Sequence, residues 1–403
     1  MSQTKVKPEL IDGGVGTDWQ EDIKVSNFVA AAGKGYFVDT TSGAITITLP
    51  VGVVGAQITI QDYAGTFHIN NVSLNANGTE KIQGEASNPG TIITKHATTT
   101  LVYQDSVKGW TAQNVTANTI NISYLVVAGG GGSGARYGGG GGAGGYKTNY
   151  PGTALSIDQG TNYTVTVGGG GSAGTGGSTG QAGGSGFDSV FSSITSTGGG
   201  GGSGADGGPA SNGGSGGGGS AADHSGGFGT SGEGNNGGDY TNTGNYYYAA
   251  GGGGADQAGE TASTTRRGDG GDGLPNNITG TNLYYAGGGG GGSHNPQPSS
   301  GGGSGGQGGG GNAGAMGGKN VGTDGTDNTG GGAGGGSTNT SGSSASNGAT
   351  GGSGIVVLRY PNTKTLNIPS GSGLITSHLN TAISGTSDKY TRFTGGTGTI
   401  SFS

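Results

Sequence analysis

Two glycine-rich turns place aspartates where they could bind a metal ion. The sequence reads RGDGGDG at residues 267–273 and TDGTDN at residues 323–328. Carboxylates and backbone carbonyls are the oxygen ligands that Ca²⁺ takes, but neither segment completes an EF-hand loop or a calcium-binding nonapeptide repeat. Aspartate is also common in turns without a metal, because its side chain bonds to nearby backbone. We therefore predict solvated turns and no metal site, and we leave Ca²⁺ binding by these turns open.

The histidines and one glycine motif are the residues that could indicate catalysis or cofactor binding. The histidines are far apart and show no HxxxH or HExxH spacing, so no metal centre or general base is predicted. They are His68, His96, His224, His294 and His378. Gly129, Gly131 and Gly134 satisfy GxGxxG after the strand-like YLVVA, but a nucleotide site also needs a helix next. The following ARYGGGGGAGG cannot be helical, so no cofactor is predicted.

Composition excludes several classes of protein. The chain has 107 glycines and 10 prolines in 403 residues, 28% apolar residues and no cysteine. Each interior glycine costs a helix about 1 kcal/mol relative to alanine, so a helical fold is excluded and an all-β fold is predicted. The formal net charge of −7 leaves no basic surface for nucleic acid. No run approaches the roughly 20 apolar residues of a membrane span, and the start MSQTKVKPELIDGG has no signal-peptide core.

Changes in composition divide the chain into four parts. Residues 1–24 read as an extended arm, with Trp19 as a docking anchor. Residues 25–118 alternate apolar and polar positions, as in AITITLP, and predict an antiparallel β module for assembly or attachment. Residues 119–360 form a glycine-rich region bracketed by YLVVA and GIVVLRYP, two β-branched segments expected to pair. Residues 361–403 predict a C-terminal hairpin that turns at Gly395 and Gly396.

The long glycine runs follow apolar or aromatic residues in a repeated manner. Tyr247 and Tyr248 precede the run at 251–254, and Tyr284 and Tyr285 precede the run at 287–292. Such tyrosines could stack on sugars, but their matched position favours a structural role as anchors at the edge of the glycine region. Anchored runs would serve no purpose in a flexible linker, so an ordered arrangement is predicted.

Glycine runs can be ordered only through their backbone. Folding must recover about 1–2 kcal/mol of backbone entropy per residue, and a run without side chains can do so only by hydrogen bonds and close packing between chains. An extended helix with three residues per turn points every N–H and C=O sideways toward a neighbour. We therefore predict a central polyglycine-II sandwich whose rims carry the polar loops.

Several segments resemble a known family. SYLVVAGGGGSGARYGGGGGAGGY, GGSGIVVLRYP and DKYTRFTGGTGTISFS resemble glycine-rich structural proteins of tailed bacteriophages, especially those of marine and cyanobacterial hosts. The N-terminal GYFVDTTSGAITITLP is similar to a module of cyanophage tail fibres. The glycine region also resembles the polyglycine sandwich of distal adhesins on long tail fibres, whose loops select the bacterial receptor.

This resemblance implies a virion tail-fibre protein, made in the host cytoplasm, that is not an enzyme. It implies a homotrimer, other tail or fibre proteins as partners, and a bacterial surface receptor that is a polysaccharide or an outer-membrane protein. Loop residues rich in hydrogen-bonding or aromatic groups then become candidates for receptor contact. They are Tyr137, His224, Tyr240, Tyr246, Arg266, Arg267, His294 and Asn295. The alternatives are a fibre or capsid-surface protein without a receptor role, and a tailspike that degrades polysaccharide with two carboxylates.

Overall fold

Strands are the regular secondary structure of this protein. The computed structural model describes residues 17–86, 90–112, 116–117, 119–220, 225–240, 247–294, 303–315, 320–338 and 346–403. Every regular element in these ranges is a strand, which confirms the prediction of an all-β fold. Nothing in them forms a helix capable of crossing a membrane. The chain divides into two compact units, Met1–Thr119 (unit 1) and Ile120–Ser403 (unit 2).

Unit 1 contains two sheets that enclose one apolar core. The first sheet has the order β1(Asp18–Trp19), β3(Lys34–Val38), β5(Gln57–Asp62), β10(Thr98–Tyr103), β11(Trp110–Thr111), β7(Lys81–Ile82), β8(Glu85–Ala86). The second has the order β12(Thr116–Ala117), β9(Gly90–Ile92), β6(Val72–Asn75), β4(Ile45–Thr48), β2(Phe28–Val29). Ile45, Ile47 and Leu49 are all buried in the core, as their alternation predicts.

The first six strands of unit 1 wind back and forth between its two sheets. Strands β1, β3 and β5 are parallel neighbours in one sheet, and β2, β4 and β6 are parallel neighbours in the other. The prediction of an antiparallel module is wrong for this half, because each strand pairs with the strand two further along the chain. Antiparallel pairing occurs among the later strands, where β10 pairs with β5 and β9 with β6.

Strand β1 lies within the stretch that was predicted as an extended arm. Its Trp19 stacks on Phe37 of β3, with ring centroids 4.6 Å apart, and Asp18 pairs with Lys34 of the same strand. The Trp19 side chain is 38% exposed. The docking expected of Trp19 therefore takes place on unit 1 itself.

Strands from the beginning and from the end of unit 2 together form two sheets. The first has the order β14(Tyr146–Thr148), β13(Thr119–Val127), β23(Ile355–Pro361), β26(Asp388–Gly395), β25(Ile375–Ala382), and β15(Leu155–Asp158) also pairs with β13. The second has the order β18(Ile194–Ser196), β17(Ser189–Phe191), β16(Tyr163–Thr166), β27(Thr397–Phe402), β24(Leu366–Asn367). Two further pairs are β19(Tyr247–Tyr248) with β22(Ser293–His294) and β20(Leu274–Asn276) with β21(Leu283–Tyr285).

The bracketing strands pair as predicted, but the C-terminal hairpin does not form. Antiparallel pairing of β13 with β23 places Val126 opposite Val356. Strand β26 pairs with β23 and β25, whereas β27 pairs with β16 and β24. Gly396, with φ of +85°, turns the chain from one sheet into the other. The reason is packing, because Phe393 and Phe402 are both buried in the core that these two sheets share.

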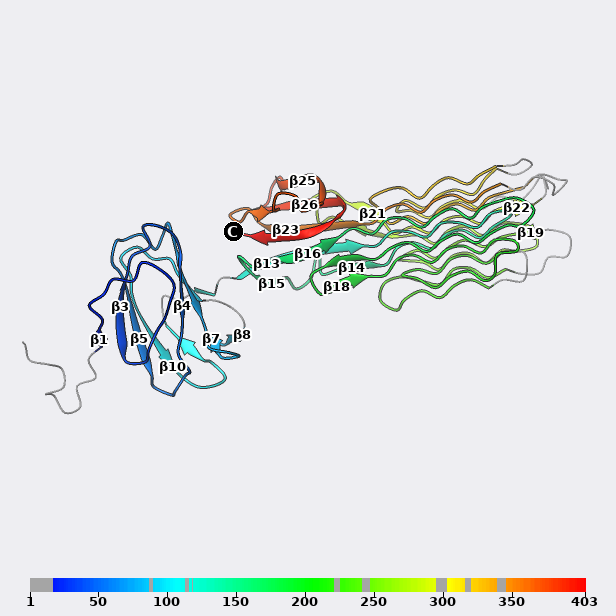
Figure 1. Cartoon of the computed structure of the whole chain (residues 1–403). Helices are drawn as coiled ribbons and strands as arrows, with labels where there is room; N and C mark the ends of the chain where they lie inside the picture. The colour runs from blue at the N-terminus through cyan, green and yellow to red at the C-terminus, as the bar shows by residue number, and fades with distance from the viewer. Residues whose placement is uncertain are drawn as a thin grey trace, which may run out of the picture. The chain divides into compact units, whose positions relative to one another are not determined.

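Between β13 and β23 the chain makes repeated passes that consist largely of glycine. We call the described residues of 128–354 that lie outside the strands the glycine layer. Figure 1 shows its segments running side by side from the sheets of unit 2 to the end marked by β19 and β22, which we call the distal end. The first pass, 128–134, returns as 138–145, and both segments are buried throughout.

Backbone hydrogen bonds in the glycine layer repeat every three residues. Six successive N–H groups of the first pass donate in rotation to three different segments. The donor–acceptor pairs are Gly129–Phe187, Gly130–Gly352, Gly131–Gly142, Gly132–Gly184, Ser133–Ala349 and Gly134–Gly139. A strand would repeat every two residues and bond to at most two neighbours. The rotation through three neighbours matches a helix with three residues per turn.

The first pass is surrounded by six neighbouring segments. Its carbonyl groups accept hydrogen bonds from three segments other than those to which it donates. The donor–acceptor pairs are Gly199–Gly129, Gly171–Gly130, Ala333–Gly131, Gly202–Gly132, Gly174–Ser133 and Gly336–Gly134. Such packing leaves no room for a side chain at glycines such as Gly131, where a Cβ would lie 2.1 Å from the Gly200 oxygen, and Gly289, where it would lie 1.9 Å from the Ala333 oxygen. Backbone takes the place of side chains in the core of this region.

Candidate functional site

The distal end brings together aromatic residues from three separate parts of the chain. Tyr137 lies in the turn between the first two passes, where Arg136 and Tyr137 both have positive φ. Tyr247 of β19 is the direct cross-strand partner of His294 of β22. We call Tyr137, Tyr247 and His294 the distal aromatic cluster. Two of its members were predicted as receptor contacts and the third as a structural anchor.

The three rings of the cluster are in mutual contact. Tyr137 stacks on Tyr247, with ring centroids 5.3 Å apart and an interplanar angle of 19°. His294 meets both tyrosines edge-on, with its centroid 5.6 Å from each. Tyr247 remains 38% exposed despite these contacts. The arrangement is a preformed aromatic surface that is open to solvent on one side.

An ion pair borders the cluster. The Arg136 guanidinium lies 5.6 Å from the Tyr137 ring centroid, within the range of a cation–π contact. Its Nη1 donates to Asp206 Oδ2 at 3.0 Å and to the Ser178 carbonyl at 3.0 Å. Asp206 also accepts the backbone N–H of Gly180. The pair therefore ties together the turns that contain residues 136, 178–180 and 206.

The cluster changes the acidity of its members. Burial raises the pKa of Tyr137, Arg136 lowers it, and Asp206, Tyr247 and Tyr240 raise it, which places the predicted contact residue Tyr240 nearby. Burial and then the Arg136 charge lower the pKa of His294. Both effects favour neutral side chains at neutral pH. A neutral imidazole can donate from one nitrogen and accept at the other.

Buried polar atoms without partners lie next to the cluster. Ser293 and Thr338 are each 1% exposed, and their hydroxyls have no hydrogen-bond partner. His294 Nδ1 also lacks a partner. Thr338 is bridged to His294, so its hydroxyl and His294 Nδ1 belong to one neighbourhood, whereas Ser293 pairs with the buried Tyr248 and faces the opposite side of β22. Unpaired buried polar atoms are few in native proteins, and each raises the question of what pairs with it.

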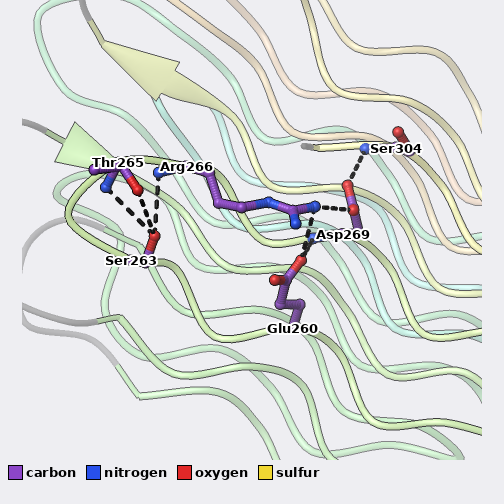
Figure 2. Close-up of polar contacts among 6 residues, drawn as sticks. All are labelled: Glu260, Ser263, Thr265, Arg266, Asp269 and Ser304. Carbon is purple, nitrogen blue, oxygen red and sulfur yellow. Dashed lines mark hydrogen bonds and ion pairs between the residues drawn. The ribbon is translucent and has the colours of Figure 1, made fainter. Parts of the chain in front are cut away.

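Arg266 forms a second polar group, in the turn shown in Figure 2. Its guanidinium contacts Glu260, at 3.2 Å, and Asp269, and its backbone N–H donates to Ser263 Oγ. Asp269 in turn accepts the backbone N–H of Ser304 at 2.8 Å. Arg266 is 42% exposed. It is thus available to solvent, but its charge is balanced by two carboxylates.

Arg267 does not lie on the surface. It is 9% exposed and Nη1 donates to the Gly314 carbonyl at 2.8 Å. Burial lowers the pKa of its guanidinium. Its placement as a receptor contact is therefore corrected: the side chain crosses between segments of the glycine layer. Sequence reasoning missed this because adjacent residues of an extended segment point in different directions.

The four tyrosines predicted as anchors divide into two kinds. Tyr248 and Tyr285 are 1% and 2% exposed, whereas Tyr247 and Tyr284 are 38% and 43% exposed. Each pair lies on a strand, where neighbouring side chains face opposite sides. Burial fits an anchoring role for Tyr248 and Tyr285, while Tyr247 belongs to the distal cluster. The predicted contacts His224, Tyr246 and Asn295 lie outside the described residues.

The aspartates of the two glycine turns bond to backbone rather than to each other. They lie three residues apart, and each accepts an N–H from a neighbouring segment whose donors are also three residues apart. The pairs are Asp269–Ser304, Asp272–Gln307, Asp324–Thr350 and Asp327–Ser353, at 2.7–2.9 Å. Asn236 and Asp239 bond Gly229 and Gly226 in the same way. The described residues contain no group of three acidic or histidine side chains arranged to hold a metal.

A concavity of about 460 Å³ lies where the glycine layer meets the sheets of unit 2. Tyr124, Lys147 and Glu233 contribute to its lining. Lys147 Nζ lies 2.8 Å from Glu233 Oε1, and Glu233 also accepts the Thr197 N–H at 2.6 Å. The Glu233 side chain is only 5% exposed. The Glu233 charge is balanced by Lys147 within the protein. This concavity is therefore a weaker candidate for ligand binding than the distal cluster.

Comparison with known families adds to this geometry. The sequence matches the glycine-rich domain family over residues 105–361. The chain belongs to this family. The matched stretch ends with β23, so the glycine-rich domain includes the whole glycine layer and the distal cluster. The comparison with curated proteins gives no match.

Proposed function

We propose that this chain is a virion structural protein of a tail fibre that displays its distal end to a receptor on a bacterial surface. The observation that carries the proposal is the distal aromatic cluster, in which Tyr137, Tyr247 and His294 come from three separate passes. Recognition residues commonly lie on turns held by a rigid scaffold. Resemblance to phage fibre proteins and membership of the glycine-rich domain family agree with this role.

The scaffold in this proposal is a polyglycine-II sandwich. Its support is the three-residue rotation of hydrogen bonds and the six neighbours of the first pass. A segment held on six sides cannot shift without breaking many backbone bonds at once. Turns at its end are therefore held in place although they contain few apolar residues. This arrangement suits a protein that must meet a surface at its tip.

Unit 1 serves assembly in the proposal, with a homotrimer as its arrangement and other fibre proteins as its partners. Unit 1 encloses an apolar core of its own, so a trimer is not needed to complete that core. The observation that supports a trimer is the exposed connection between β4 and β5. Val51, Val53 and Val54 in it are 64%, 68% and 74% exposed. Adjacent exposed valines are typical of a surface that another chain covers.

The proposed protein is not an enzyme. A polysaccharide-degrading tailspike needs two carboxylates about 5–9.5 Å apart that are free to act on substrate. Asp269, Asp272, Asp324 and Asp327 each hold a backbone N–H, and Asp206 and Glu233 are ion-paired. These acids stabilise the fold. Release of reducing sugars from host polysaccharide by the purified chain would contradict this part of the proposal.

A binding experiment separates recognition from a purely structural role. The chain has no cysteine, so a single Ser403→Cys substitution at an exposed position allows one dye to be attached. Binding to cells of the virus's host is then measured by flow cytometry. Tyr137→Ser with Tyr247→Ser should lower binding about five- to 150-fold, since two aromatic contacts of about 0.5–1.5 kcal/mol each are removed. Tyr284→Ser is the matched control, because Tyr284 is 43% exposed on β21 near the opposite end. Equal binding by all three proteins would favour a structural fibre protein.

A further inference from the structure

We infer that the distal aromatic cluster binds a pyranose saccharide, an inference that rests on the proposed function and names its ligand. The residues that carry it are Tyr137, Tyr247 and His294, with the unpaired hydroxyl of Thr338 beside His294. Two kinds of ligand were open for this site, a polysaccharide and a protein. Three properties of the site favour the saccharide.

The first property is the size and shape of the exposed surface. Tyr247 offers a ring that is 38% exposed and supported from behind by Tyr137 and from the side by His294. The supported ring cannot turn freely, so binding immobilises little. A pyranose presents an apolar C–H face of about the size of one aromatic ring. A protein partner would need a wider apolar centre surrounded by further contacts.

The second property is the hydrogen-bonding capacity around the ring. His294 Nδ1 and the hydroxyl of Thr338, which is bridged to His294, are buried and have no partner. Hydroxyl groups both donate and accept, so they can pair with another hydroxyl or with either state of an imidazole nitrogen. A water that joins His294 Nδ1 to the Thr338 hydroxyl and to a saccharide hydroxyl would satisfy groups that the fold leaves unsatisfied.

The third property is charge. Among the described residues the cation that borders the rings is Arg136, which is paired with Asp206 at 3.0 Å and with a backbone carbonyl. The border of the cluster is therefore close to neutral, and a neutral polyol fits it better than a nucleic acid, which the net charge of −7 would repel.

The test uses the dye-labelled full chain and host cells treated in two ways. Periodate cleaves vicinal diols and destroys saccharides, whereas protease removes exposed protein loops. We expect periodate to abolish binding and protease to leave it unchanged. Polysaccharide released from the same cells by mild acid should compete with the cells for the chain, and periodate-oxidised polysaccharide should not.

Variants connect the result to the cluster. Tyr247→Ala should lower affinity for the released polysaccharide about three- to tenfold, and Tyr247→Phe should keep most of it because the ring remains. Tyr284→Ala is the control, and the melting temperature of each variant shows whether it has folded. Binding that depends on Tyr247 but resists periodate and is lost with protease would overturn the saccharide and keep receptor recognition. Binding that depends on no distal residue would overturn the proposed function itself.

Discussion

Unit 1 and the glycine layer of unit 2 have cores made of different atoms, side chains in unit 1 and backbone in the glycine layer. Unit 1 buries side chains such as Ile47, Ile58 and Leu101 between two sheets, with a period of two residues along each strand. The glycine layer buries backbone against backbone, with a period of three. Burial of apolar surface stabilises unit 1, by about 25 cal/mol per Å². The glycine layer depends on paired backbone N–H and C=O groups and on close contact between neighbouring segments.

This difference predicts opposite responses to mutation. A side-chain core tolerates the loss of atoms at a moderate cost and tolerates exchange of one apolar residue for another. A backbone core has no side-chain atom to lose, but an added methyl is expected to destabilise it wherever the Cβ would meet a neighbouring backbone. Four experiments test this difference between unit 1 and the glycine layer.

The largest effect is expected in the side-chain core. Ile47→Ala should lower the free energy of unfolding of unit 1 by about 2–5 kcal/mol, because Ile47 is fully buried. Both tryptophans, Trp19 and Trp110, lie in unit 1, so urea titration followed by tryptophan fluorescence reports on that unit. Val107→Ala, at an exposed position outside the proposed assembly surface, is the control and should change little. Loss of protease resistance in the glycine layer of the Ile47 variant would show that the two units are not independent.

An added methyl in the glycine layer should have the next largest effect. A Cβ on Gly170 would lie 1.8 Å from the Gly351 oxygen, whereas one on Gly169 meets only a Phe187 ring carbon at 3.8 Å. Gly170→Ala should destabilise the layer by about 1–3 kcal/mol, as overpacking does in other cores. Gly169→Ala, its neighbour in sequence, should not. Hydrogen exchange of segments 168–186 measures the difference, and equal exchange in the two variants would contradict a backbone-packed core.

Loss of one aspartate contact should have a smaller effect. Asp272→Ala removes the acceptor for the Gln307 N–H and should destabilise that pair of segments by about 1 kcal/mol. Asp272→Asn keeps an acceptor oxygen and should be close to the parent protein. Faster hydrogen exchange around Gln307 in the alanine variant alone would agree with this. Stabilisation of the parent protein, but not of either variant, by added Ca²⁺ would instead support a metal site.

The smallest effect is a dependence of stability on pH at the distal end. The folded-state pKa of His294 lies below its ordinary value of 6.5. The unfolded chain therefore binds a proton first as pH falls, so stability from this group is full above 6.5 and declines as pH falls toward the folded pKa. Tyr137, Arg136 and Tyr247 face the imidazole. Melting curves between neutral and acidic pH should show this decline in the parent protein and less of it in His294→Gln. An identical pH profile in both proteins would remove His294 as its source.

Much of the fold follows from local patterns. Alternation in AITITLP predicted a two-sided strand, and Ile45, Ile47 and Leu49 are indeed buried. The β-branched runs predicted the pairing of β13 with β23. Glycine content excluded helices, since the cost per residue accumulates over any run. These predictions succeed because each depends on the character of one segment or on two unusually apolar ones.

Partner choice between segments was decided by tertiary structure alone. Strands of similar character could pair with the next strand or with the one after it, and the parallel pairing of β3 with β5 in unit 1 was not visible in the sequence. The hairpin predicted at Gly395 and Gly396 failed for the same reason, because β26 pairs with β23 in one sheet and β27 with β16 in the other. Local pattern gives the face of a strand but not its neighbour.

The candidate site shows most clearly which features the sequence predicts and which only the tertiary structure decides. Residue type alone marked Tyr137 and His294 as possible contacts. Only the tertiary structure placed Tyr247 opposite His294, stacked Tyr137 on it and buried Arg267. The physical reason is that glycine segments have no side chains to distinguish one neighbour from another. Their order is imposed by the turns, the anchoring strands and the aspartate contacts at their edges, which act together across the whole layer.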